Sequence, residues 1–123
     1  MKIDFDQHAG FLSIAAYGPG WIRVRDTRIE TPCVITAAEI HADLLPLSFD
    51  ELGAAHFDKL TALRPEIILI GSGSRQRFVE HALSAQLAAA GIALEAMDTG
   101  AACRLFNILV SEDRAVIAAL FML

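Results

Sequence analysis

The second half of the chain alternates strand patterns with helix patterns, and this alternation restricts the fold more than any other feature. Residues 66–70 form a run that is continuously apolar after Glu66, which is typical of a strand buried on both faces. Residues 76–90 follow with apolar side chains at helical spacing, and residues 92–97, 99–110 and 115–121 continue as strand, helix and strand. Because parallel strands need crossover connections, this order predicts a largely parallel sheet flanked by helices.

The first half of the chain is typical of antiparallel β structure. Strands are predicted at residues 11–17, 21–25, 29–36 and 39–44, and the first two are joined by the turn Gly18-Pro19-Gly20. Pro32 indicates an edge position or a bulge within the third strand. A helix is predicted at residues 54–63, where Pro65 ends it. The sequence therefore predicts one domain, residues 1–123, in which a β-meander precedes the alternating half.

Composition excludes a disordered chain and sets expectations about partners. The chain has 123 residues, of which 54% are hydrophobic and 20% charged, enough to form a single core. The apolar surplus predicts a surface covered by a protein partner or by another copy of the chain. A net charge of −5 with scattered basic residues argues against nucleic acid. Arg23, Arg25 and Arg28 form one local basic group, which we interpret as a solvated strand edge.

The sequence also indicates a cytoplasmic location. Residues 1–6 are acidic and resemble neither a signal peptide nor a basic transit peptide. No uncharged apolar run reaches the roughly 20 residues that span a bilayer, so we do not expect an integral membrane protein. Cys33 and Cys103 match no disulfide or metal-ligand spacing, and no metal or cofactor is predicted.

A glycine-serine loop stands between the strand predicted at residues 66–70 and the helix predicted at residues 76–90. It consists of Gly71, Ser72, Gly73 and Ser74. The two glycines permit backbone angles that let successive amides point at one anion, and Ser74 is placed to cap the next helix. The loop lacks the third glycine of a dinucleotide fingerprint and the Gly-Lys-Ser/Thr ending of a phosphate loop. It indicates either an anion-binding loop or a tight turn with a serine cap.

A polar stripe follows the helix predicted at residues 99–110. Thr99, Cys103 and Asn107 recur every four residues and would line a pocket beside the glycine loop. Cys103 is either a small buried hydrophobe, the usual state of a free cysteine, or a pocket thiol. The four histidines are scattered, so the sequence indicates no base to activate this thiol and no catalytic residue. Redox sensing would need a setting that favours the thiolate, and the sequence shows none.

Arg114 opens the last predicted strand and permits two interpretations. It could clamp an anionic group over the same pocket. It could also form an ordinary ion pair with Glu112, Asp113 or Glu95.

One family of small α/β proteins resembles this chain in architecture and in a set of short motifs. The family includes the mitochondrial respiratory complex I assembly factor 3 and its prokaryotic relatives. The matching segments are the strand, Gly-x-Gly loop and helix, then Glu95-Ala96-Met97-Asp98-Thr99, Ala102-Cys103, Asn107-Ile108-Leu109 and residues 112–120. The chain departs from the family pattern at Leu105, where threonine usually follows the residue equivalent to Arg104.

The resemblance implies a three-layer α/β domain, in which an N-terminal β-meander packs with a mixed, partly parallel sheet flanked by helices. It also implies a role in assembly or interaction more than in catalysis. We therefore predict a non-catalytic protein that acts through protein–protein contact, in the assembly of a membrane complex. The alternative is an anion-binding protein or enzyme that uses residues 71–74 with Thr99, Cys103, Asn107 and Arg114.

Overall fold

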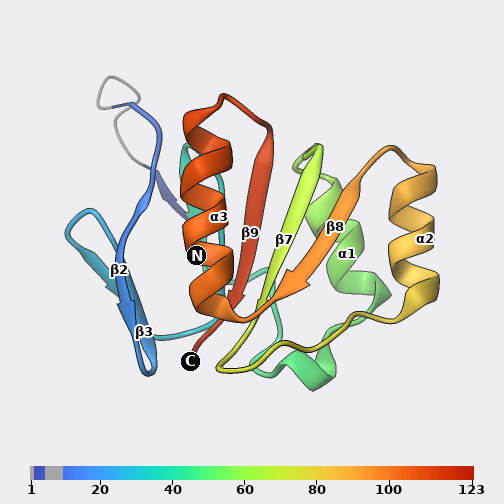
Figure 1. Ribbon diagram of the computed structural model, residues 1–123, viewed down its shortest axis with the longest axis horizontal. Coiled ribbons are helices and arrows are strands. Elements are labelled where there is room, and N and C mark those ends of the chain that lie inside the picture. Colours follow the sequence, from blue (N-terminus) through green and yellow to red (C-terminus); the bar gives the residue numbers. More distant parts are fainter. Residues whose placement is uncertain (1, 5–9) are drawn as a thin grey trace.

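A mixed β-sheet, sheet A, forms the centre of the molecule (Figure 1). The computed structural model describes residues 2–4 and 10–123. Over these residues sheet A has six strands in the order β1-β6-β5-β9-β7-β8. Their bounds are β1 Lys2–Asp4, β5 Cys33–Ile35, β6 Glu39–His41, β7 Ile67–Ser72, β8 Ala93–Met97 and β9 Val116–Phe121. β7 runs parallel to β8 and β9, whereas β5 pairs antiparallel with β9 and β6, and β1 pairs antiparallel with β6.

A second sheet, sheet B, contains the predicted meander. Its three strands in the described chain are β2 Ile14–Gly18, β3 Trp21–Val24 and β4 Thr27–Ile29, and all pair antiparallel. The turn between β2 and β3 places Gly20 at φ 81°, in the left-handed region that favours glycine. The register shifts between Ile14 and Ala16, so β2 carries a bulge.

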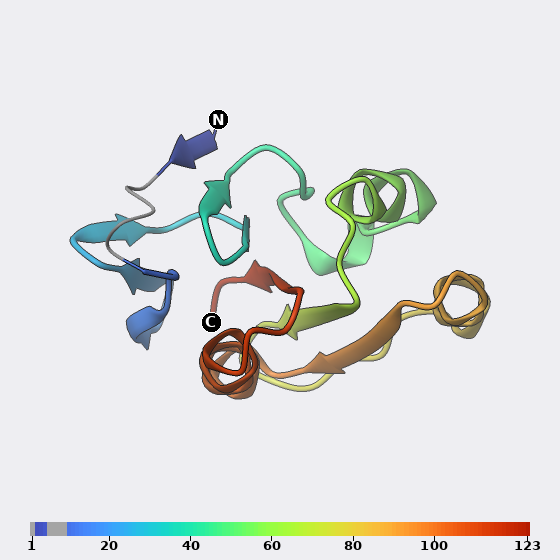
Figure 2. The ribbon, with the colours of Figure 1, turned by 90° about the horizontal axis from the view of Figure 1, so that it is seen from above.

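The helices complete three layers. In the described chain they are α1 Ala54–Thr61, α2 His81–Ala89 and α3 Thr99–Ser111, with a 3₁₀ turn at Phe49–Glu51. Sheet B and α3 lie on one face of sheet A, α1 lies on the other, and α2 lies at the β8 end (Figure 2). This arrangement confirms the predicted fold class, a mixed α/β domain with a meander and a partly parallel sheet flanked by helices.

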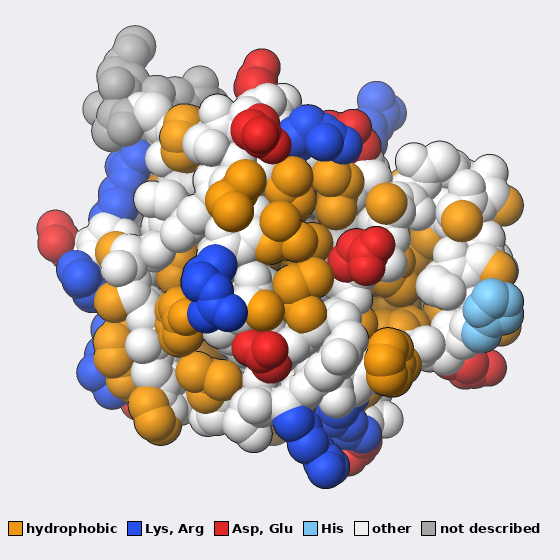
Figure 3. All heavy atoms as spheres, viewed as in Figure 1, with side chains coloured by type: hydrophobic (Ala, Val, Ile, Leu, Met, Phe, Trp, Pro, Cys, Tyr) orange, Lys and Arg blue, Asp and Glu red, His pale blue; other side chains and the backbone are white. Residues whose placement is uncertain are grey.

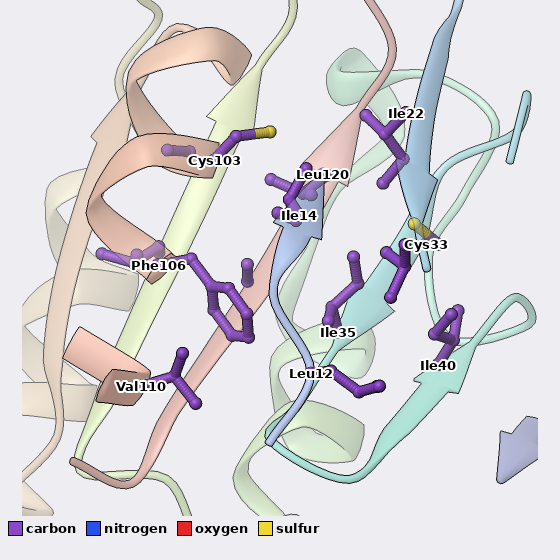
Figure 4. Packing of buried hydrophobic residues seen from close by; sticks show 14 of the residues in the cluster. Leu12, Ile14, Ile22, Cys33, Ile35, Ile40, Cys103, Phe106, Val110 and Leu120 are labelled. Carbon is purple, nitrogen blue, oxygen red and sulfur yellow. The ribbon is translucent and has the colours of Figure 1, made fainter. Parts of the chain in front are cut away.

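The two faces of sheet A form separate hydrophobic clusters among the described residues. Successive strand side chains point to opposite faces, so Leu69 and Leu120 join the cluster beneath α3 and sheet B. Their neighbours Ile70 and Phe121 join the cluster beneath α1. In the first cluster, Figure 4 shows Phe106 of α3 projecting towards side chains of both sheets. β7 and β9 are buried on both faces, which explains their continuous apolar sequences.

Two predicted elements differ from the structure by more than a shift of up to three residues at their ends. Residues 29–36 are not one strand, because the chain leaves sheet B after Ile29 and enters sheet A at Cys33, with Pro32 in the gap. The helix expected from residue 76 begins only at His81, and its N-cap is Glu80, so the prediction that Ser74 caps it is wrong. β1 was not predicted.

The reason for the late start of α2 lies in Ser72. The hydroxyl of Ser72 accepts a hydrogen bond from the backbone N–H of Arg77 at 3.0 Å and lies 2.7 Å from the carbonyl oxygen of Arg75. These contacts tie residues 73–77 back onto the end of β7 as an irregular loop. The helix therefore starts five residues later than the apolar periodicity indicates.

Candidate functional site

The glycine-serine loop is held by hydrogen bonds to its own surroundings. Besides its contacts with Arg75 and Arg77, Ser72 Oγ lies 3.0 Å from the carbonyl oxygen of Met97, at the end of β8. A hydroxyl has one proton, so the two carbonyls share it. Ser72 thereby connects the C-terminal ends of β7 and β8, and its polar atom is used within the fold.

Thr99 connects the loop to the last strand. Its side chain is fully buried, and its Oγ1 donates a hydrogen bond to the carbonyl oxygen of Phe121 at 2.6 Å. The same oxygen accepts a hydrogen bond from the backbone N–H of Gly73 at 2.8 Å, and Thr99 N–H donates to the Gly73 carbonyl at 2.9 Å. Gly73 has φ 101°, a conformation open to glycine. We call this arrangement of Gly73, Thr99 and Phe121 the Thr99 hydrogen-bond cluster.

The space between the loop and α3 is filled. A Cβ atom added at Gly71 would lie 2.9 Å from Thr99 Oγ1 and 2.9 Å from a methyl of Leu120. The glycine is therefore required by close packing of β7 against the start of α3. Gly71, Ser72, Gly73 and Thr99 lie together, as the sequence analysis expected, but as a packed and hydrogen-bonded unit.

The outer part of the loop is open. Ser74 is exposed, as is the following residue, Arg75. Within residues 10–123 neither backbone amide makes an intramolecular hydrogen bond.

Cys103 and Asn107 point to sheet B and the core. Cys103 is 1% exposed, and burial raises the pKa of its thiol to about 12, so the reactive thiolate is absent at neutral pH. Asn107 accepts a hydrogen bond from the Ile14 N–H at 2.7 Å and donates one to the Ile14 carbonyl at 3.0 Å. These two bonds fix α3 to the bulge in β2.

Arg114 lies at the other end of sheet A. It lies two residues before the start of β9, whereas the glycine loop lies at the C-terminal end of the parallel strand β7, about 17 Å away along a six-residue strand. Its Nε donates to Glu66 Oε1 at 2.9 Å, and the Ala115 N–H donates to the same oxygen at 3.0 Å. Arg114 forms an ion pair, as one interpretation of the sequence held, but its partner is Glu66 and not an acid in residues 95 or 112–113. The hydrogen bond from Arg114 lowers the pKa of Glu66 most, and the bond from the Ala115 N–H lowers it further.

Exposed apolar side chains mark a surface that the sequence analysis did not locate. Ile108 on α3 is 54% exposed, with Leu105 and Leu109 partly exposed beside it. We call these three residues the apolar α3 face. Figure 3 shows apolar side chains gathered on this side of the molecule. The sequence held one signal of this surface, because Ile108 is apolar yet lies outside the stripe that packs on the sheet.

A second apolar site lies where residues 77–80 pass α1 and α2. Phe78 is 79% exposed and lines a hollow of about 320 Å³ together with Phe49, Leu52 and Leu83. The Arg77 guanidinium stacks 4.6 Å above the Phe49 ring. Asp50, which forms an ion pair with Arg77, and Glu80 also line the hollow, so its surface combines apolar side chains with charges of both signs.

The described residues give no support for a metal or for membrane insertion by a helix. Nowhere in residues 2–4 and 10–123 do three histidine, cysteine, aspartate or glutamate side chains gather as metal ligands would. None of the helices in those residues has both the length and the apolar character that crossing a bilayer demands.

Together these features define a class of protein. It is a small mixed α/β domain in which most of the polar candidate residues are engaged inside the fold and apolar side chains are exposed outside it. The chain belongs to the protein family of unknown function DUF498/DUF598, whose model matches residues 14–121.

Known relatives agree with this assignment. An uncharacterised protein of Rhodobacter capsulatus is 34% identical over 112 residues, covering 91% of this chain and 86% of that protein. The NADH dehydrogenase [ubiquinone] 1 alpha subcomplex assembly factor 3 of Xenopus tropicalis is 28% identical over 116 residues. That match covers 91% of this chain and 62% of the assembly factor. The crystal structure of a Bordetella parapertussis protein is similar with a TM-score of 0.83 and 32% identity, covering 90% of this chain and 95% of that one.

Proposed function

We propose that this protein is a non-catalytic assembly factor that acts through protein–protein contact on a membrane complex. The observation that carries the proposal is the family membership, because that family includes a protein named for assembly of NADH dehydrogenase. The chain spans 62% of the length of that relative, so the proposal concerns the shared domain.

The surface of the domain supports contact with another protein. Large apolar side chains such as Ile108 and Phe78 are more than half exposed. Complete burial of a side chain of this size stabilises a complex by about 1.5–3 kcal/mol. Exposed groups of this kind are typical of interaction sites. The Cys103 thiol is buried and protonated at neutral pH, and this supports the non-catalytic part of the proposal.

Affinity purification from the native host tests the proposal. The full chain is tagged, expressed at its natural level, and purified from cells opened with a mild detergent. We expect subunits of one membrane complex, or its assembly intermediates, in constant ratio to the bait. Recovery of the protein alone as a monomer would refute the proposal, and recovery of only a second copy would indicate a homo-oligomer instead.

Surface variants locate the contact. Ile108→Glu places a charge on the apolar α3 face and should reduce partner recovery at least tenfold. Leu47→Glu is the matched control, because Leu47 is 83% exposed and lies outside α3. Equal recovery with both variants would exclude the apolar α3 face as the contact.

Cell fractionation of the same strain tests the proposed cytoplasmic location.

Anion binding is a second proposal, and the open amides of Ser74 and Arg75 favour it. They follow Gly73, whose positive φ occurs in turns that direct successive amides at one anion. In this proposal the packed residues Gly71, Ser72 and Thr99 shape the loop. The ligand screen described in the Discussion tests it.

A further inference from the structure

β8 presents a free strand edge. It is the last strand of sheet A, and its other side is paired with β7. The Ala93 N–H donates to the Glu66 carbonyl at 3.0 Å, towards β7. Because backbone groups alternate sides along a strand, the N–H and C=O of Leu94 and Ala96 point away from β7.

Most of these outward groups are unpaired. The Ala96 carbonyl accepts a hydrogen bond from Gln76 Nε2 at 3.2 Å. For the Leu94 N–H and C=O and the Ala96 N–H, no hydrogen-bond partner exists among residues 2–4 and 10–123. Unpaired backbone groups in a row are the template on which a further strand forms.

A groove lies along this edge. Its hollow of about 180 Å³ is bounded by β8 on one side and by residues 76–79 and α2 on the other. Leu94, Val79 and Phe78 provide apolar walls, and Glu95 is the one charged residue among the described residues that line it. Figure 3 shows a recess beside the lobe that carries α2, with apolar side chains in it. A groove between an edge strand and a helix is one of the geometries in which proteins bind extended peptides.

The charge of Glu95 decides between two occupants. If β8 paired antiparallel with β8 of a second copy through both Leu94 and Ala96, the two Glu95 side chains would lie directly opposite each other. Like charges in that position are destabilising. A strand from another protein with a lysine or arginine opposite Glu95 would instead form a favourable cross-strand pair. The two neighbours of that basic residue would point into the apolar groove.

We propose that the free edge of β8 binds an extended segment of a partner protein as an additional strand, with the pattern apolar-basic-apolar centred on Glu95. The inference rests on the proposed function, because it names the partner chemistry and adds a second contact surface. The backbone groups of Leu94 and Ala96 supply affinity, and Glu95 supplies the charge preference.

Two synthetic peptides test the proposal. The probe is fluorescein-labelled Ser-Thr-Val-Lys-Val-Thr-Ser, and its twin carries glutamate in place of lysine. Fluorescence anisotropy should show the lysine peptide binding at least tenfold more tightly, and nuclear magnetic resonance should show the Leu94 and Ala96 amide signals shifting. The proposal would be overturned if neither peptide bound at a peptide concentration of about 1 mM, or if the shifted amide signals came only from another surface.

Variants separate the two sources of recognition. Glu95→Lys should reverse the order of the two peptides, and it preserves the fold because Glu95 is exposed. Ala96→Pro removes the outward N–H without removing a bond to β7 and should weaken both peptides at least tenfold. Ala96→Ser keeps that N–H and is the matched control. An unchanged peptide order in Glu95→Lys refutes the charge preference even if the proline variant fails to fold.

Purification from the host distinguishes this inference from the proposed function. If wild type recovers partner subunits and Glu95→Lys recovers them equally, the β8 edge is excluded while the assembly role stands. If wild type recovers no partner, the assembly role itself is refuted.

Discussion

Replacement of Thr99 by valine should destabilise the protein strongly, because the side chain keeps its shape and loses its hydroxyl. The change breaks the bond to the Phe121 carbonyl at 2.6 Å and the bond from the Gly73 N–H at 2.8 Å. Both partners belong to buried residues, so each is left without a hydrogen bond and out of reach of water. A buried group left unpaired costs about 1–3 kcal/mol, and the two together should cost about 2–6 kcal/mol.

That loss is large beside the stability of a typical domain, about 5–15 kcal/mol. Urea unfolding followed by circular dichroism measures it, and the melting temperature should fall by roughly 6–20 °C for a chain of this size. Thr99→Ser is the control, because it retains the hydroxyl and loses one methyl, at a cost of about 1 kcal/mol. If the free energy of unfolding of Thr99→Val lay within about 0.5 kcal/mol of wild type, the Thr99 hydrogen-bond cluster would be refuted as a stabilising element.

Three further predictions concern the other candidate residues. Asn107→Leu removes both hydrogen bonds between α3 and β2 and should cost about 1–4 kcal/mol in urea unfolding, whereas an unchanged midpoint would show that α3 docks without them. Burial raises the pKa of Cys33 and Cys103 to about 12 from 9.0. The unfolded chain therefore binds fewer protons above pH 9, so stability should fall between about pH 9 and 12 and fall less in the double alanine variant. If residues 71–74 hold an anion, phosphate at ~100 times its dissociation constant should stabilise the protein by about 2.7 kcal/mol, and no thermal shift with phosphate, nucleotides or carboxylates would reject that proposal.

Periodicity was sufficient to predict the central strands and the last helix. Residues 67–70 and 115–121 are apolar at every position because both faces of β7 and β9 are covered. The helix starting at Thr99 was predictable because Asp98 caps it, accepting a hydrogen bond from the Ala101 N–H at 2.9 Å.

A local side-chain contact and the pairing of distant strands explain what periodicity missed. The first helical turns expected after residue 75 do not form, because Ser72 bonds to backbone atoms of residues 75 and 77 and holds that segment as a loop. The strand expected at residues 29–36 divides because its two halves join different sheets. Pro32 indicated an irregularity in that strand, but which sheet each half joins depends on distant strands.

The same limit applies to the candidate site. The sequence placed Gly71, Gly73 and Thr99 near one another, since a parallel sheet brings the ends of neighbouring strands together. It could not show that these groups bond to each other. Asn107 shared the same helix stripe, but its hydrogen-bond partner is Ile14, 93 residues away in the chain. A spacing of four residues predicts that side chains share one helix face. It does not predict which other element packs against that face.

The position of β9 has a consequence for biosynthesis. This strand joins the antiparallel part of sheet A, through β5, to the parallel part, through β7, and it follows every other element along the described chain. During translation the edges of β5 and β7 that pair with β9 stay unpaired until residues 116–121 emerge from the ribosome. We expect nascent chains stopped before residue 116 to bind chaperones or aggregate, and pairing of β9 to be the step that commits the domain to its native state.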